Sequence, residues 1–97
     1  TSVENSLEHL SVDEFTLYQN YPNPFNPSTS ISFSLPQAEQ VKISVYDMLG
    51  REVAVLVNDY LESGFHTTLF DGKNLSSGVY VYRIESGSFL KAKQMIL

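Results

Sequence analysis

The sequence predicts an all-β protein in which about seven short strands pack as a two-layer sandwich. From Phe15 onward, apolar residues recur at every second position, which is the period of a strand with one buried face. Turn-forming residues separate these runs at short intervals, and no long run keeps helical periodicity after residue 14. Many short strands at close spacing are typical of a sandwich or a small barrel, and the sandwich is favoured.

Seven segments of the chain have the alternation or the composition of strands. An opening strand is expected at residues 15–19, and alternating runs follow at residues 31–35, 41–45 and 53–57. The apolar residues of each run, such as Val53, Val55 and Val57 in the third, are expected to share one buried face. Segments rich in β-branched and aromatic residues lie at 65–71, 79–86 and 89–97. Gly50 is expected to take a positive φ in a tight hairpin with Leu49.

The composition excludes several kinds of function. The chain has 97 residues, enough for one domain with a single core, and no cysteine, which excludes a disulfide framework and a thiolate metal site. A net charge of −5 without a basic stripe argues against nucleic-acid binding. No run approaches the roughly 18 apolar residues of a membrane-spanning helix, so no membrane span is expected. No cofactor is expected.

Negative charge is concentrated at the beginning of the chain. Residues 1–14 contain four acidic residues and no Lys or Arg, a charge of −4. Residues 15–97 contain seven acidic and six basic residues, a charge of −1. A flexible acidic linker is favoured over one or two helical turns at residues 1–14. We therefore expect this linker to precede a folded domain at residues 15–97.

Proline dominates residues 21–28, whose sequence is YPNPFNPS. Each proline fixes φ, removes an amide donor and keeps the preceding residue extended, so this segment is not expected in the middle of a sheet. One interpretation is a stiff crossover in which Tyr21 and Phe25 close one end of the core. The other is a rigid surface segment with few hydrogen bonds of its own, which suits docking because little entropy is lost on binding.

Residues 74–83, with the sequence NLSSGVYVYR, form the second unusual segment. Gly78 opens an expected strand on which Tyr80 and Tyr82 share one face, while Val79 and Val81 share the other. The sequence leaves open which face is buried. Tyrosines two residues apart could form a platform for sugars or peptides, but core tyrosines with hydrogen-bonded hydroxyls are favoured.

The last expected strand carries Lys91 and Lys93 on one side. No acidic residue follows Glu85, so residues 86–97 carry a charge of +2. One interpretation is an edge strand that its lysines protect from aggregation. The other is a free C-terminal edge with which a partner pairs, and the two interpretations are compatible.

The sequence offers no catalytic constellation. His9 lies in the expected linker and His66 in an expected strand, so the two lack metal-ligand spacing. There is neither a G-x-S-x-G motif nor a glycine-rich phosphate loop. Asp47, Asp59 and Asp71 are each expected near a turn, where aspartate is common. The chain is therefore not expected to be an enzyme.

Five blocks of sequence, in their order along the chain, carry a resemblance to a known family. They are FxLYQNYPNPFNPS at residues 15–28, IxFxLP at 31–36, VYDMLGREV at 45–53, LxxGVY at 75–80 and MIL at 95–97. The chain resembles the C-terminal sorting domain (type A) of proteins that the type IX (Por) secretion system of Bacteroidetes-like bacteria exports. It departs from the usual pattern at Gln94, where the family usually has Lys or Arg.

The resemblance implies a seven-stranded, immunoglobulin-like sandwich at the C-terminus of a larger cargo protein. It implies a non-catalytic signal that the type IX outer-membrane translocon recognises in the periplasm, so that the cargo is secreted or reaches the outer cell surface. A sortase-like cysteine protease would remove the signal, with cleavage expected within residues 1–14.

The candidate recognition residues lie in the proline-rich segment, at the start of the 79–86 strand and along the last strand. They are Pro22, Asn23, Pro24, Phe25, Pro27, Gly78, Tyr80, Lys91, Lys93, Met95, Ile96 and Leu97. The alternative function is a passive or adhesive immunoglobulin-like module of a surface enzyme, with carbohydrate as one candidate ligand. That alternative predicts a flat exposed patch of Tyr46, Tyr80 or Tyr82, whereas an enzyme would need Asp47 and Asp71 to converge in a cleft.

Overall fold

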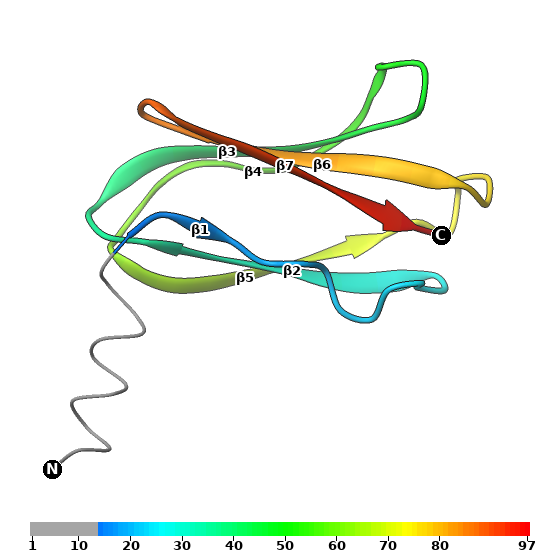
Figure 1. The fold of residues 1–97 in the computed structure, drawn as a ribbon, viewed down its shortest axis with the longest axis horizontal. Helices are drawn as coiled ribbons and strands as arrows, with labels where there is room; N and C mark the ends of the chain where they lie inside the picture. The colour runs from blue at the N-terminus through cyan, green and yellow to red at the C-terminus, as the bar shows by residue number, and fades with distance from the viewer. Residues whose placement is uncertain (1–13) are drawn as a thin grey trace, which may run out of the picture.

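The computed structural model describes residues 14–97, and every regular element in that part of the chain is a β-strand (Figure 1). The strands are β1 (Thr16–Leu17), β2 (Ser28–Leu35), β3 (Glu39–Tyr46), β4 (Glu52–Leu61), β5 (Gly64–Asp71), β6 (Val79–Ser86) and β7 (Phe89–Ile96). The predicted all-β fold of about seven strands is confirmed. The linker expected at residues 1–14 lies outside the described residues, except for Glu14. No helix that could cross a membrane occurs within residues 14–97.

The strands form two antiparallel sheets that lie face to face (Figure 1). One sheet has the order β1-β2-β5, and the other has the order β4-β3-β6-β7. The chain crosses between the layers after β2, β4 and β5, which is the alternation expected of an immunoglobulin-like sandwich. The sandwich, rather than a small closed barrel, is therefore the observed architecture.

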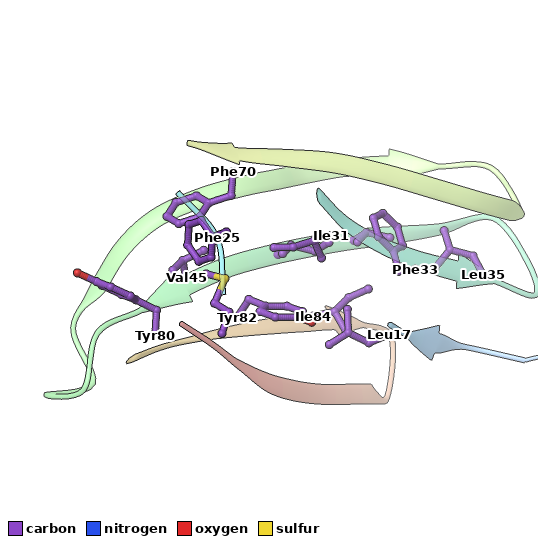
Figure 2. Packing of buried hydrophobic residues seen from close by; sticks show 13 residues of the cluster. Leu17, Phe25, Ile31, Phe33, Leu35, Val45, Phe70, Tyr80, Tyr82 and Ile84 are labelled. Carbon is purple, nitrogen blue, oxygen red and sulfur yellow. The ribbon is translucent and has the colours of Figure 1, made fainter. Parts of the chain in front are cut away.

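The core lies between the two sheets and is built from every second residue of their strands (Figure 2). On β6, Tyr80, Tyr82 and Ile84 face inward, which settles the face that the sequence left open. Burying one large apolar side chain, such as that of Ile84, contributes about 1.5–3 kcal/mol to stability. The buried apolar residues are Leu17, Phe25, Ile31, Phe33, Leu35, Val41, Ile43, Val45, Phe70, Tyr80, Tyr82, Ile84 and Met95.

Strand β4 departs from the alternation that its sequence predicts. Its pairing with β3 shifts register twice, between Ile43 and Ser44 and between Val45 and Tyr46. Each shift inserts an extra residue, which exchanges the two faces of the strand. The expectation that Val55 is buried is therefore wrong: its side chain is 46% exposed.

The opening strand is shorter than expected. Only Thr16 and Leu17 pair fully with β2, although the Tyr18 amide still donates a hydrogen bond of 3.0 Å to the Ser32 carbonyl. Before β1, the ring of Phe15 stacks on Phe89 at 4.8 Å. This short strand therefore begins beside the start of β7.

The connecting segments gather at two ends of the sandwich (Figure 1). One end holds the turns between β2 and β3, β4 and β5, and β6 and β7. The other end, called the motif end below, consists of residues 21–27, 47–51, 72–78 and 95–97. Segments far apart in the sequence thus meet at the motif end, together with the end of the chain.

Candidate recognition site

The motif end is assembled by backbone hydrogen bonds between three of its four segments. Gly78 and Leu97 exchange a pair of them, at 3.1 and 2.9 Å. The Phe25 amide donates to the Ile96 carbonyl at 2.9 Å, and the Gly72 amide donates to the Pro27 carbonyl at 2.8 Å. The proline-rich segment, the β5–β6 loop and the last residues of β7 therefore form one connected surface.

Within the proline-rich segment, the aromatic residue that was expected to close the core does so. Phe25 is 2% exposed and lies edge-on to Phe70, with ring centroids 5.9 Å apart. Figure 2 shows the two rings together at one end of the core. The same expectation is wrong for Tyr21, which is 80% exposed because its backbone forms an isolated bridge with Ser30 and its ring points to solvent.

The proline-rich segment forms its hydrogen bonds with residues outside it, which fits the expectation that it has few of its own. The Pro22 carbonyl accepts hydrogen bonds from the Asn20 amide group at 3.1 Å and from the Thr29 hydroxyl at 2.8 Å. Asn20 and Thr29 are themselves buried and bonded to each other at 3.0 Å. These buried polar groups hold the backbone from the inside while the rings of Pro22 and Pro24 remain exposed. Pro27 and Asn23 are also exposed.

Residues 95–97 have three different environments. Met95 is fully buried in the core, Leu97 packs against the core from its edge, and Ile96 is 46% exposed on the outer face. The Ile96 amide donates a hydrogen bond of 3.0 Å to Oδ1 of Asn23. Of the three, only Ile96 presents a largely accessible side chain, while Met95 serves the fold.

The two lysines of β7 lie on the same side of the strand, as expected. Both share the inward side with Met95, at the edge of the four-stranded sheet, where Lys91 is exposed and Lys93 half-buried. Within residues 14–97 neither lysine forms an ion pair. Inward-pointing charges of this kind are typical of edge strands.

Gly78 has the conformation that glycine allows, with a φ of +152°. A Cβ atom placed on it would meet no heavy atom within 4 Å, so the requirement for glycine comes from the backbone and not from packing. Gly50 likewise has a φ of +82°, which confirms the expected hairpin between β3 and β4.

The tyrosines of β6 belong to the core and not to a binding platform. Tyr80 is 7% exposed and donates its hydroxyl to the Ser76 carbonyl at 2.6 Å. Tyr82 is fully buried and donates to the Tyr18 carbonyl at 2.7 Å, and burial raises its pKa to about 12. The adhesive alternative predicted that Tyr80 or Tyr82 would belong to a flat exposed patch, and this prediction is wrong for both residues.

Tyr46 lies on the outer face of the four-stranded sheet, under Arg83. The guanidinium carbon lies 4.9 Å from the ring centroid, and Nη2 of Arg83 donates a hydrogen bond of 2.7 Å to the Tyr46 hydroxyl. Nη2 also lies 3.2 Å from Oε1 of Glu85. A cation stacked on the ring and bonded to its hydroxyl leaves little of Tyr46 for a flat patch.

The sequence predicted the β3–β4 turn as a hairpin but did not place Met48 and Leu49 among the candidate recognition residues. The tip of the turn exposes these two large apolar side chains, Met48 at 66% and Leu49 at 77%. The Asp47 carboxylate holds the turn by accepting hydrogen bonds from the amides of Leu49 and Arg51, at 2.9 and 3.0 Å, and from Nε of Arg51 at 2.8 Å. The Arg51 amide, followed by its side chain, lowers the pKa of Asp47. The sequence signal for this exposed apolar tip is the pair Met48 and Leu49 directly before the turn glycine, Gly50.

The carboxylates of Asp47 and Asp71 are each bonded within their own part of the chain. Asp47 is bonded within its own turn, and Oδ1 of Asp71 accepts the Lys73 amide at 3.0 Å. Asp59 lies within β4, two residues before the strand ends at the β4–β5 turn. The ring of His66 stacks on Phe33 at 5.4 Å. Residues 14–97 contain no group of three His, Asp or Glu side chains that could hold a metal ion.

The protein is a small β-sandwich, and residues of four of its distinctive sequence blocks lie together on the surface of the motif end. The family model described as the secretion system C-terminal sorting domain matches residues 19–97, and the chain belongs to this family. None of the curated proteins compared with the chain gives a significant match. The domain is therefore a type IX sorting signal, a generally non-catalytic class that marks proteins for secretion or the cell surface. Such a signal interacts with the type IX machinery and belongs to an upstream cargo.

Proposed function

We propose that the type IX outer-membrane translocon recognises this domain at the motif end of the sandwich. The observation that supports this most strongly is the meeting of four sequence blocks there. The proline-rich block, the Gly78 block and the C-terminal triplet are separated by many residues, yet backbone hydrogen bonds join them. The β3–β4 turn lines a shallow hollow together with the Gly78 block, which brings the fourth block to the same surface. The fold alone does not require such a meeting of distinctive residues, because most of them are exposed and contribute little to the core.

The motif end is also suited to recognition because its backbone is already fixed. Buried Asn20 and Thr29 hold the Pro22 carbonyl, and Asp47 holds the β3–β4 turn. A surface held in this way loses little conformational entropy when a partner covers it. The exposed rings of Pro22 and Pro24 and the side chains of Met48 and Leu49 supply apolar contact area.

The proposal includes a division of the chain into two regions. Residues 1–14 link the cargo to the sorting domain at residues 15–97, and a sortase-like cysteine protease cleaves within this linker after export. The acidic composition of residues 1–14, with a charge of −4, supports a linker because such a segment has too little apolar surface to fold alone. Cleavage then separates the cargo from the folded domain without cutting a strand.

The test is a reporter fusion. Residues 1–97 are fused to the C-terminus of a periplasmic reporter, and surface display is measured in a type IX-competent strain and in a strain that lacks the translocon. Display that depends on the translocon is the expected result. Retention of a folded fusion in both strains would contradict the proposal.

The last three residues need substitution rather than deletion. Deleting residues 95–97 removes the fully buried Met95 and the Gly78–Leu97 hydrogen bonds, so lost export would report unfolding. Ile96→Ser changes an outward-facing side chain and keeps the backbone bonds to Asn23 and Phe25. We expect this variant to lower display while the melting temperature stays within a few degrees of the wild type.

A specific observation also supports the adhesive module as a second function. On the outer face of the three-stranded sheet, the rings of Tyr18 and Phe65 lie 5.5 Å apart and are 37% and 57% exposed. The hydroxyls of Ser32 and Thr67 lie 3.0 Å from each other on the neighbouring strands. Exposed aromatic rings beside hydroxyls are suited to sugars. A glycan-binding screen with the purified domain, and with a Phe65→Ala variant as its control, tests this function.

A further inference from the structure

The outer edge of β7 consists of the backbone groups of alternate residues. β7 is the last strand of its sheet and pairs only with β6. Leu97 exchanges hydrogen bonds with Gly78, and the pairing continues without a register shift. In an antiparallel pair every second residue bonds to the partner strand, so the groups of Leu90, Ala92, Gln94 and Ile96 point away from β6.

The half of this edge that belongs to the motif end is already closed. The Ile96 amide donates to Asn23, and the Ile96 carbonyl accepts from the Phe25 amide. The Gln94 carbonyl accepts a hydrogen bond of 2.7 Å from Nε2 of Gln19. Gln19 and the proline-rich segment therefore cap β7 from the Gln94 carbonyl onward, so the expected free C-terminal edge is closed over this part.

The other half of the edge is open. No hydrogen bond from another described residue reaches the outward backbone groups of Leu90 or Ala92, or the Gln94 amide. The side chain of Leu90 is also 60% exposed. An edge with unpaired donors and acceptors accepts an added strand, which is a common way for proteins to bind extended peptides.

The charge beside the open edge is positive. Lys91 and Lys93 alternate with the outward backbone groups, and residues 86–97 have a charge of +2 because no acidic residue follows Glu85. The edges of β4 and β5 have the opposite character, since residues 52–71 contain four acidic residues and no Lys or Arg. An acidic strand is therefore attracted to β7 and repelled from the other long edges.

We infer that an extended acidic segment of the partner adds to β7 as a further strand between Leu90 and Gln94. Its backbone pairs with the open groups, and carboxylates at alternate positions lie beside Lys91 and Lys93. The inference rests on the proposed function, because the partner is the machinery that reads the sorting signal. It assigns to the open edge a mode of binding that the motif end, with its closed backbone, does not offer.

The test uses the full chain fused to the reporter, with Ala92→Pro as the main variant. Proline at residue 92 removes an outward amide and no bond to β6, and an edge strand tolerates it at such a position. Leu69→Pro on β5 is the matched control. The backbone N–H and C=O of Ser30 both bond to Tyr21 and not to β5. Leu69, which lies opposite Ser30 on β5, therefore directs its amide away from β2, toward the free edge of the sheet. The side chain of Leu69 is 71% exposed.

We expect Ala92→Pro to lower translocon-dependent display by about tenfold, the effect of losing one to two hydrogen bonds from an interface, while Leu69→Pro keeps it. If the wild type is displayed and both proline variants are displayed as well as the wild type, strand addition is overturned and the sorting function stands. If the wild type itself is retained, the proposed function fails. Melting temperatures of the purified domains check that the two variants are folded.

The charge of the partner is tested separately, which also covers the case in which Ala92→Pro does not fold. The double variant Lys91→Glu with Lys93→Glu is expected to lower display at least as strongly, and Lys42→Glu, on the outer face of the inner strand β3 and outside the motif end, serves as the control. Unchanged display of the folded double variant overturns the acidic partner. Sedimentation of the purified domain completes the test: self-association that Ala92→Pro abolishes would assign the edge to a second copy and overturn the inference.

Discussion

At the scale of single residues, the buried tyrosine hydroxyl of β6 ties the two sheets together. Tyr82 belongs to the four-stranded sheet, and its hydroxyl donates to the carbonyl of Tyr18, directly after β1 in the other sheet. Tyr82→Phe keeps the ring and leaves that carbonyl without its donor. We expect the free energy of unfolding to fall by about 1–2 kcal/mol in urea titrations. Tyr46→Phe, whose hydroxyl lies on the outer face, is the control.

The same hydroxyl makes stability depend on alkaline pH. Burial raises the pKa of Tyr82 from 10.0 to about 12 in the folded state. Because this pKa is raised, the contribution of the protonated Tyr82 hydroxyl to the free energy of unfolding is fully present below pH 10 and is lost as the pH rises from 10 through 12. We expect the wild-type melting temperature to fall across that range and Tyr82→Phe to fall less steeply. Parallel curves for the two proteins would contradict the assignment.

At the scale of elements, one side chain fastens the proline-rich segment to the edge of β7. Oδ1 of Asn23 accepts the Ile96 amide at 3.0 Å. Asn23→Ala removes this acceptor, and we expect the Ile96 amide to exchange with solvent faster while stability falls by about 1 kcal/mol. Hydrogen exchange measured residue by residue checks this. The Ala92 amide, which already lacks a partner among the described residues, should exchange quickly in both proteins.

The strand β6 depends on the conformation of the residue before it. Gly78 has a φ of +152°, which a β-branched residue rarely adopts. We expect Gly78→Val to destabilise the domain by about 1 kcal/mol or more, although nothing crowds the site. A variant as stable as the wild type in denaturant titrations would show that the backbone relaxes there at no cost.

The elements differ in how well the sequence predicts them. In strands β2 and β3, apolar residues alternate with polar ones, so their buried apolar faces follow from the period alone. Strand β6 has apolar or aromatic residues on both faces, so the period left its buried face open until the structure settled it. Strand β4 was predicted as a strand, but the two register shifts that expose Val55 depend on its pairing with β3 and leave no local signal. The prediction that Tyr21 closes one end of the core failed for a similar reason, because the bridge between Tyr21 and Ser30 sets the direction of the ring.

At the scale of the whole molecule, the site depends on contacts that join distant parts of the chain. The sequence blocks identified the residues of the motif end, but not that Asn23 and Phe25 would close β7 at Ile96. That closure divides the last strand into a capped half and an open half. Period and composition carry no information on such a contact, which spans most of the chain.

The central claim, that the motif end is the recognised surface, is tested most directly by comparing substitutions at the two ends of the sandwich. One reporter fusion carries Pro24→Ala with Ile96→Ser at the motif end, and the other carries Gln37→Ala with Glu62→Gln at the opposite end. All four side chains are at least partly exposed. We predict that display falls by about tenfold for the first fusion only, with similar melting temperatures for both. Equal display of the two fusions would contradict the claim.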